Sequence, residues 1–306
     1  MKAITHPGFL AGERRPVVLA AGFFDGVHKG HERVIRIAVD RARKLGGRAW
    51  VMTFDPHPMD VLRPGAAPLL LTSTRHKLRI LERLGVYGCL VMSFTRQLAA
   101  IEPEVFVRRL RRSIPTLREI IVGNNWRFGR RGKGDAALLT ALGGTMGFKV
   151  TVVRPALYRG RMVSSTRIRS AIMRGNLDRA AAMLGRPFSV MGTVIHGRGM
   201  GRKLGFPTAN LNCHSEALPP CGIYAVRALV DGRMRDGIVN LGTRPTFIRK
   251  NVKPLLELHL FNTHRNLYGR DVEVVFVQKL RNERRFASAD ALSAQIRGDV
   301  ARARRL

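Results

Sequence analysis

The chain has 306 residues, 45% of them hydrophobic, and this length allows two domains with cores of their own. No run of about 18 apolar residues occurs, and the first residues lack the apolar segment of a signal peptide, so we expect neither a membrane span nor a membrane partner. The formal net charge is +33, which favours anionic partners and predicts weak, nonspecific attraction to nucleic acid at low salt.

The basic residues are spread over both halves of the chain, and the densest run is RRLRR at 108–112. This spread gives no reason to expect a specific nucleic-acid partner, although a basic nucleic-acid-binding protein stays open as an alternative. The three cysteines, Cys89, Cys213 and Cys221, have spacings unlike a disulfide framework or a zinc site. A reducing, cytoplasmic setting is the simplest expectation.

The first half of the chain alternates strands and helices. Apolar runs predict buried strands at 16–20, 48–54, 88–94, 117–123 and 148–153. Helical spacing predicts helices at about 30–44, 74–84, 103–112, 136–142 and 166–175, and then a short helix that ends at Gly185. The prolines of 55–68 predict a loop. Strands that alternate with helices in this way favour a Rossmann-like α/β domain with a parallel sheet.

The second half has strand patterns without helices between them. Strands are predicted at 188–196, 222–230, 233–241, 255–261 and 271–280, separated by turn signals such as VDGR and LYGR. This pattern favours an antiparallel barrel or sandwich, closed by one helix at about 288–305. The change of pattern places the domain boundary near Arg186–Pro187, which gives domains 1–186 and 187–306.

The stretch GFFDGVHKGH at 22–31 lies where the first predicted strand turns into a helix. Its histidines, His28 and His31, could be metal ligands, packing residues or phosphate-handling groups. Zinc needs three or four ligands, and no suitably spaced partners are evident. A helix N-terminus offers free N–H groups to an anion, and Gly26 and Gly30 allow its close approach. The placement favours two imidazoles that stabilise charge during attack on the α-phosphorus of ATP.

A second helix start carries further groups that suit a triphosphate. The stretch GRMVSSTRIR places Ser164, Ser165 and Thr166 between Arg161 and Arg169. Hydroxyls, free N–H groups and guanidinium groups all bind phosphate oxygens, whereas plain helix capping is the alternative. The loop VGNNWRFGRRGKGD follows a predicted strand, and its asparagine and aromatic side chains could contact adenine or ribose.

The strongest motif of the second half is GTVIHGRGMGRKLGFPTANLN at 192–212, which matches neither the P-loop nor the dinucleotide pattern. Its glycines could fold over phosphates, and Thr208 and Asn210 offer oxygen ligands to Mg²⁺, with a glycine-rich turn as the alternative. Glu257 alternates with the apolar Leu256 and Leu258, so it lies on the opposite face of its strand. It is the candidate base for an attacking hydroxyl, or else a solvated carboxylate.

The motifs follow one another in a fixed order: GFFDGVHKGH, TFDPHP, VGNNWRFG, VSSTRIR, GRKLGFPTAN, GIYAV, GIVNLGTRPTF, LYG and RNERRF. In this order they resemble the bifunctional bacterial riboflavin kinase/FAD synthetase family over nearly the whole chain. The resemblance implies a Rossmann-like nucleotidyl-transferase domain followed by an antiparallel flavokinase barrel with a C-terminal helix. It implies that the barrel domain converts riboflavin and ATP to FMN with Mg²⁺. The first domain would convert FMN and ATP to FAD and pyrophosphate.

The resemblance also implies roles for residues of both domains. In the first domain, His28 and His31 would be catalytic, with further ATP contacts from Gly22, Phe24, Asp25, Gly26, Gly30, Asn125, Arg161, Ser164, Ser165, Thr166 and Arg169. Flavin contacts there would come from Phe54, Pro56 and Pro58. In the second domain, Glu257 would be the catalytic base, and Thr208 and Asn210 would be the ligands of Mg²⁺–ATP. Further ATP contacts would come from Gly199, Gly201, Arg202, Lys203, Gly205 and Pro207. Its flavin contacts would be Asn240, Arg281, Glu283 and Phe286.

The expected partners are therefore small molecules, namely riboflavin, FMN and ATP. A family member with only one active site remains an alternative, although the motifs of both halves are intact. The sequence leaves weak self-association open.

Overall fold

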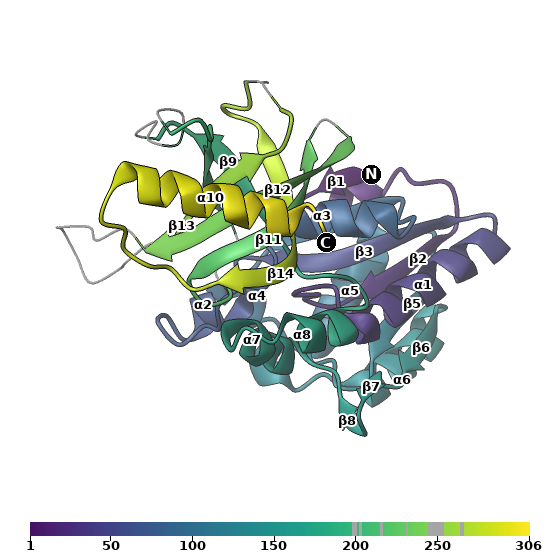
Figure 1. Ribbon diagram of the computed structural model, residues 1–306. Coiled ribbons are helices and arrows are strands. Elements are labelled where there is room, and N and C mark those ends of the chain that lie inside the picture. Colours follow the sequence, from purple (N-terminus) through teal and green to yellow (C-terminus); the bar gives the residue numbers. More distant parts are fainter. Residues whose placement is uncertain (198–200, 202–203, 215–216, 231, 244–253, 264–265) are drawn as a thin grey trace. The chain divides into compact units, whose positions relative to one another are not determined.

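The computed structural model describes residues 1–306 except 198–200, 202–203, 215–216, 231, 244–253 and 264–265 (Figure 1). The chain divides into two compact units, Met1–Pro68 with Lys77–Ser165, and Leu69–His76 with Thr166–Leu306. A domain boundary at 186/187 stays a prediction. Within the described residues, none of the helices has the length and apolarity that a bilayer crossing requires.

The first unit contains a parallel six-stranded sheet with the order β1-β4-β3-β2-β5-β6. Its strands are β1 (Lys2–Ile4), β2 (Val17–Ala21), β3 (Arg48–Asp55), β4 (Gly88–Ser93), β5 (Leu117–Gly123) and β6 (Lys149–Val153). Five of them confirm the predicted strands to within about two residues, a normal uncertainty for element ends. The sequence did not predict β1, because three residues are too few to show a period.

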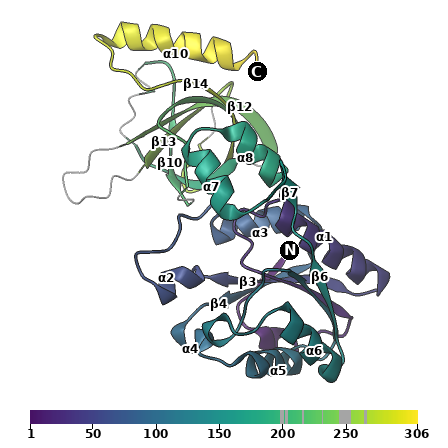
Figure 2. The ribbon, with the colours of Figure 1, turned by 90° about the horizontal axis from the view of Figure 1, so that it is seen from below.

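Helices cover both faces of this sheet (Figure 2). The helical elements of the unit are η1 (Pro7–Leu10), α1 (Lys29–Lys44), α2 (Pro58–Leu62), α3 (Thr74–Arg83), α4 (Arg96–Ala99), α5 (Pro103–Ser113), η2 (Arg130–Gly132) and α6 (Ala136–Met146). The first three residues of α3 belong to the second unit, and the helix enters the first unit at Lys77. The hairpin β7 (Leu157–Tyr158) and β8 (Arg161–Met162) follows. The predicted loop at 55–68 was wrong in its middle, because Pro58 occupies the first helical position of α2 and the His57 side chain caps its start.

Strand β2 shows why the sheet needs two layers of helices. All five of its residues are buried. Val17 and Leu19 belong to the core that contains Phe106 of α5, whereas Val18 belongs to the core that contains Ile35 of α1. Successive side chains of a strand point to opposite faces, so an all-apolar strand is stable only when both faces are covered.

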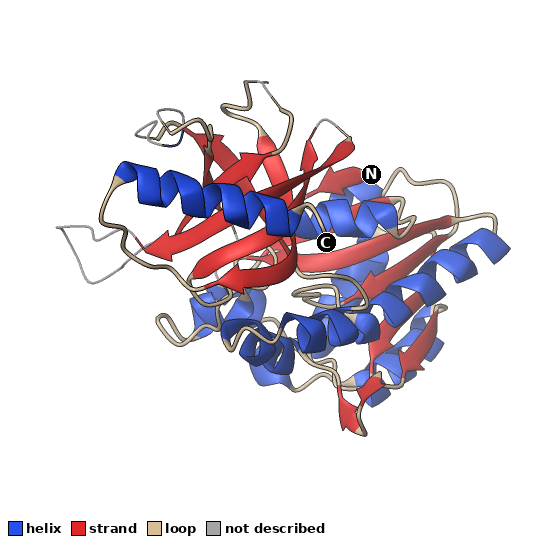
Figure 3. Ribbon diagram, in the orientation of Figure 1, coloured by secondary structure: helices blue, strands red, loops and turns tan. Residues whose placement is uncertain are grey.

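The second unit contains a closed antiparallel barrel with the order β10-β13-β12-β11-β14-β9. Its elements are α7 (Ser165–Met173), which begins at the last residue of the first unit, α8 (Leu177–Leu184), β9 (Ser189–Ile195), β10 (Ala209–Cys213), β11 (Gly222–Val230), β12 (Arg233–Thr243), β13 (Pro254–Leu260), β14 (Asp271–Arg281) and α10 (Ala289–Ala303). The barrel and the terminal helix confirm the prediction (Figure 3). Strand β10 was not predicted, because the sequence ANLNC contains two asparagines.

The terminal helix α10 packs on the barrel through its last turns. Ile296, Val300 and Ala303 join a cluster with Ile223 of β11 and Ile238 of β12. The side chain of Ser288 accepts a hydrogen bond from the Ala291 amide and fixes the start of the helix. The helix thus lies on the outward-facing side chains of two central barrel strands.

Candidate active sites

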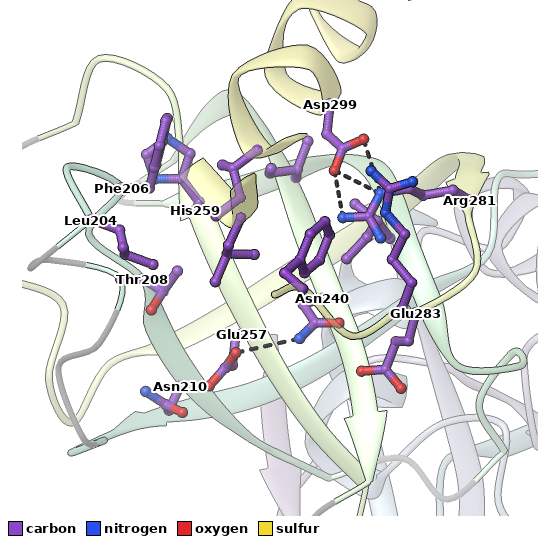
Figure 4. A pocket seen from close by; sticks show the side chains of 17 residues that line it. Leu204, Phe206, Thr208, Asn210, Asn240, Glu257, His259, Arg281, Glu283 and Asp299 are labelled. Carbon is purple, nitrogen blue, oxygen red and sulfur yellow. Dashed lines mark hydrogen bonds and ion pairs between the residues drawn. The ribbon is translucent and has the colours of Figure 1, made fainter. Parts of the chain in front are cut away.

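The barrel unit contains a cavity of about 450 Å³ between the barrel strands and α10 (Figure 4). Its lining includes Gly201, Leu204, Phe206, Thr208, Asn210, Ile223, Ile238, Asn240, Glu257, His259, Arg281, Glu283, Arg284, Phe286, Leu292, Ile296 and Asp299. This volume is typical of a pocket for a drug-sized ligand. Apolar side chains dominate one part of the lining, and polar groups gather on the strands β10, β12 and β13.

The register of the barrel brings these polar groups into one row. Asn210 of β10 pairs with Glu257 of β13, and Glu257 pairs with Asn240 of β12. The row continues through Ile223 of β11 to Arg281 of β14. All five side chains line the cavity. The row is therefore the floor of the site, built from strands far apart in the sequence.

Glu257 lies half-buried in the middle of this row. Asn240 Nδ2 donates to Glu257 Oε2 over 3.4 Å (Figure 4). Within the part of the chain that the structure describes, the buried Asn210 Oδ1 has no hydrogen-bond partner. An unpaired buried amide oxygen is costly unless a ligand satisfies it. The floor thus offers a carboxylate that can accept a proton, beside an oxygen atom suited to a cation.

The glycine-rich segment approaches this floor closely. A Cβ atom at Gly197 would overlap the Asn210 amide, and one at Gly201 would overlap the Phe206 carbonyl oxygen. Gly205 has a φ of +82°, which L side chains rarely adopt. The exposed Pro207 contributes its carbonyl oxygen, which accepts a hydrogen bond of 2.9 Å from His259 Nδ1. The predicted residues Gly199, Arg202 and Lys203 lie outside the described residues.

The predicted flavin residues of this unit lie at one end of the cavity. Arg281 forms a double hydrogen bond to the buried Asp299 of α10, with Nε 2.9 Å from Oδ2 and 3.1 Å from Oδ1. Its guanidinium lies 5.6 Å from the Phe286 ring centroid, and that of Arg284 lies 4.8 Å from it. Glu283 is exposed and also lines the cavity. Arg281 therefore joins the barrel floor to the terminal helix.

In the first unit, His28 is the residue at which α1 begins. Its Nδ1 accepts a long hydrogen bond of 3.4 Å from the His31 amide. In a neutral ring this leaves the proton on Nε2, which is then a donor. The two imidazoles stack with centroids 3.5 Å apart. A helix start with a histidine donor can bind and polarise an anion.

The loop before α1 has an unusual backbone. Phe24, Gly26 and Val27 have φ values of 57°, 77° and 39°. A positive φ costs a residue with a side chain about 1–2 kcal/mol, so its surroundings must hold it. A Cβ atom at Gly22 would lie 2.9 Å from the Phe24 ring, and the Phe24 ring contacts His31 edge-on at 5.3 Å. The predicted residues Gly22, Phe24 and Gly26 thus shape the approach to His31.

The second helix start meets this loop through Ser165. Its Oγ donates a hydrogen bond of 3.0 Å to the carbonyl oxygen of Asp25, a buried residue. Ser164 is half-buried beside it, and Gly30 lies in the first turn of α1. Sequence positions 140 residues apart are thus joined at one place. This brings together two of the segments that carry the phosphate prediction.

The other residues predicted to contact ATP take no part in the hydrogen bond between Ser165 and Asp25. Asn125 is exposed in the loop after β5, and Arg161 is exposed on β8. Thr166 is exposed, and Arg169 donates from Nε to the Leu69 carbonyl oxygen over 2.5 Å. Thr166 and Arg169 belong to the second unit, so their contribution to the phosphate site stays a prediction.

The first unit also contains an aromatic cavity of about 380 Å³. It is lined by Phe23, Phe54, Pro58, Leu62, Phe94, Leu98, Ala99, Phe106, Trp126, Arg127, Phe128, Gly129, Arg130, Arg131 and Gly132. Trp126 and Phe128 stack with centroids 4.6 Å apart, and Phe54 contacts Phe94 edge-on. Phe23 belongs to the loop that leads to His28, so this loop contributes one side chain to the cavity lining. Pro56 is exposed and is not part of the lining.

Sequence reasoning missed several lining residues in both units. Phe206, His259 and Asp299 in the barrel and Phe23, Phe94 and Phe106 in the first unit were not singled out. For two of them the sequence held a signal, since Phe23 lies in the motif GFFDGVHKGH and Phe206 lies in GRKLGFPTAN. The others come from segments whose aromatic or charged residues fit ordinary packing.

Comparisons with known proteins match both halves of the chain. The FAD synthetase family model matches residues 11–167, and the riboflavin kinase family model matches residues 184–306. A bifunctional riboflavin kinase/FMN adenylyltransferase of Escherichia coli (strain K12) is 39% identical over 94% of this chain and 91% of its own. Proteins of the same name from Pseudomonas fluorescens and Bacillus subtilis (strain 168) are 37% and 35% identical. These two matches cover 97% of this chain and 95% and 94% of the relatives.

A solved structure supports the fold. A protein from Streptococcus pneumoniae, titled a macrolide-efflux protein, matches with a TM-score of 0.85 at 29% identity, over the whole of both chains. Taken with the two family models, these matches establish that the chain belongs to the bifunctional riboflavin kinase/FMN adenylyltransferase family, in which the C-terminal half phosphorylates riboflavin to FMN and the N-terminal half adenylylates FMN to FAD.

Proposed function

We propose that the two reactions take place at two separate sites, riboflavin phosphorylation in the barrel cavity and FMN adenylylation at the β2–α1 loop with its aromatic cavity. The corresponding domains are 1–186 and 187–306. The observation that carries this assignment is the Asn210–Glu257–Asn240 row, which supplies a base and a cation ligand inside the barrel unit alone. The helix start at His28 lies in the other unit.

In the kinase site, Glu257 accepts the proton of the attacking ribityl hydroxyl while that oxygen bonds to the γ-phosphorus of ATP and ADP leaves. Asn240 orients the carboxylate through its amide. The flavin ring lies against the apolar lining beneath α10, where Ile223, Ile238 and Ile296 provide the contact surface. Burying a flat aromatic ring against these side chains supplies binding energy without polar contacts.

The residues of the kinase site also fit Mg²⁺. This ion prefers oxygen ligands and is usually held by one or two protein groups together with nucleotide phosphates. Asn210 Oδ1 is buried, and within the described residues no hydrogen bond satisfies it; the Thr208 hydroxyl lines the same cavity. When bound there, Mg²⁺ neutralises negative charge on the phosphate oxygens of ATP. Asn210 and Thr208 would hold it, and Glu257 remains free to take the proton.

In the adenylyltransferase site, a phosphate oxygen of FMN attacks the α-phosphorus of ATP. The bond from that phosphorus to the oxygen that bridges the α- and β-phosphates breaks, and pyrophosphate leaves. No side chain needs to act as a nucleophile. The Nε2–H of His28 and the N–H groups at the start of α1 stabilise the charge that develops on the phosphate oxygens. The isoalloxazine ring occupies the aromatic cavity, where Phe54, Pro58 and Trp126 contact its faces.

The test is a time course with riboflavin, ATP and Mg²⁺, in which flavins are separated by chromatography. The unaltered protein should form FMN first and FAD second. His31→Ala should form FMN and stop there, whereas Asn210→Ala should form FAD only when FMN is supplied. Loss of both activities from either single change, in folded protein, would contradict the assignment of two separate sites.

A further inference from the structure

Among the described residues, Lys77 is the only buried lysine, and defined contacts surround its ammonium group. Its side chain is 1% exposed, on α3. Its ammonium donates to the Phe23 carbonyl oxygen over 2.8 Å and to Thr53 Oγ1 over 3.2 Å. It also lies 4.2 Å from the centroid of the Phe23 ring. Burying an ammonium costs several kcal/mol, so a chain tolerates it only where such contacts offset the cost.

The Phe23 carbonyl is held by two donors at once. Thr53 Oγ1 donates to it over 2.7 Å, in addition to Lys77. Thr53 is fully buried on β3, and Lys77 comes from α3, so two separate elements fix the plane of one peptide. The hydroxyl and the ammonium therefore act on the same atom of the loop.

That peptide leads directly into the strained residue Phe24. Its φ of 57° describes rotation about the bond that follows the Phe23 peptide, so holding the Phe23 carbonyl holds this angle. The Phe24 ring in turn contacts His31 at 5.3 Å. The ring of Phe23 itself lines the aromatic cavity and contacts the His57 ring edge-on, with centroids 4.3 Å apart. The two hydrogen bonds to the Phe23 carbonyl thus influence both His31, through Phe24, and the aromatic cavity, through the Phe23 ring.

We propose that Lys77 is a positioning residue of the adenylyltransferase site, which fixes the Phe23 carbonyl and thereby aligns His31 with the wall of the flavin cavity. Lys77 touches neither substrate in this role. It acts through Phe23, and its removal lets the loop relax from its strained backbone. Among the described residues, the hydrogen bonds of Lys77 go to Phe23 and Thr53, whereas the Asn210–Glu257–Asn240 row of the kinase site belongs to the other unit.

The electrostatic surroundings agree with this role. Burial lowers the pKa of Lys77 to about 8, whereas Asp25 and Asp55 act in the opposite direction. The buried Cys89 faces the same group, and burial raises the pKa of its thiol to about 12, so it is neutral. Asp25 belongs to the loop itself. Asp25 of the loop thus favours the charged form of Lys77, which burial disfavours.

The decisive variant is Lys77→Met, which keeps the length and apolar volume of the side chain but removes the donors and the buried charge. If Lys77 only packed the core, this change would leave both activities intact. We expect instead that kcat/KM for FAD formation falls about tenfold to a hundredfold, because a charge-assisted hydrogen bond is lost. FMN formation by the same sample should be unchanged, and Tm should be equal or higher.

Two further variants sharpen the test. Lys44→Met makes the same substitution at an exposed position in α1 and should leave both activities unchanged. Thr53→Val removes the second donor and should lower FAD formation in the same direction. Because both donors act on the Phe23 carbonyl, the effects in the double variant should not multiply. Full FAD formation by Lys77→Met, or equal loss of both activities with a lower Tm, would overturn the proposal.

Discussion

Asn210 and Glu257 lie opposite each other in the register of strands β10 and β13. Neither residue is near the other in sequence, and the pairing places the proposed cation ligand and the proposed proton acceptor side by side on the cavity floor. The relationship explains how a small barrel can hold both groups rigidly. Strand positions are fixed by backbone hydrogen bonds on both sides, so the two groups need no flexible loop to bring them together.

Replacing Glu257 with glutamine tests its role as the base. The amide keeps the shape and can still contact Asn240, but it cannot accept the proton. We expect kcat for FMN formation to fall about 10²- to 10⁴-fold, the usual contribution of general base catalysis. Adenylylation of supplied FMN should be unchanged. Glu104→Gln, at an exposed position of α5, is the matched control. A kcat that stays near that of the unaltered protein would exclude Glu257 as the base.

Gly22→Ala tests the shape of the β2–α1 loop. The new methyl group would lie 2.9 Å from the Phe24 ring, so the ring has to move away from its contact with His31. We expect FAD formation to fall about tenfold, and stability to fall by about 1–3 kcal/mol, as overpacking usually costs. Gly12→Ala is the control, since nothing lies within 4 Å of the added atom there. Equal behaviour of the two variants would contradict this view of the loop.

Asp299→Asn tests the link between α10 and the cavity floor. The change removes the charge that holds Arg281 by two hydrogen bonds and leaves the guanidinium with a weaker acceptor. We expect the KM for riboflavin to rise and stability to fall by about 1–3 kcal/mol. Asp290→Asn changes an exposed carboxylate of the same helix and should affect neither. Steady-state kinetics with varied riboflavin and a thermal melt measure both effects.

The buried Lys77 predicts a pH dependence of stability. Its pKa is about 8 in the folded protein and 10.5 as the ordinary value, so between these pH values the unfolded chain binds more protons. The free energy of unfolding therefore gains a contribution that rises with pH over this window, on the order of 3 kcal/mol in total. Below about pH 8 the full cost of the buried charge remains.

Thermal melts of the unaltered protein and of Lys77→Met measure this contribution. The Tm advantage of the variant should be largest below about pH 8 and shrink as the pH rises toward 10.5. Comparing the two proteins removes the titration of groups that they share, and Lys44→Met should show no such trend. A difference in Tm that stays constant over the window would show that Lys77 does not titrate there.

The sequence was sufficient to predict the two architectures and the central motifs. The apolar strands and the helical spacing between them predicted the parallel sheet. The position of His28 between a predicted strand and a predicted helix indicated that it lies at the start of α1. The motif order gave the family. These features depend on local periods and short motifs, which a single chain displays directly.

The rest depends on contacts that local patterns do not encode. The Asn210–Glu257–Asn240 row requires the register of three strands, and a slip of one residue would turn each side chain to the other face. Lys77 resembles any polar residue of an amphipathic helix, so its burial against Phe23 had no signal in the sequence. Asp299 of α10 was equally hidden, because its partner Arg281 lies on a different element.

Trp126 gives the protein an optical reporter of its own. The chain has two tryptophans, and they differ in setting, since Trp50 is buried in the core whereas Trp126 stacks on Phe128 in the lining of the aromatic cavity. Flavins absorb where tryptophan emits, and a flavin bound in this cavity as proposed would lie beside the indole. Quenching of the Trp126 emission can therefore follow occupancy in real time, and a Trp126→Phe protein supplies the background from Trp50.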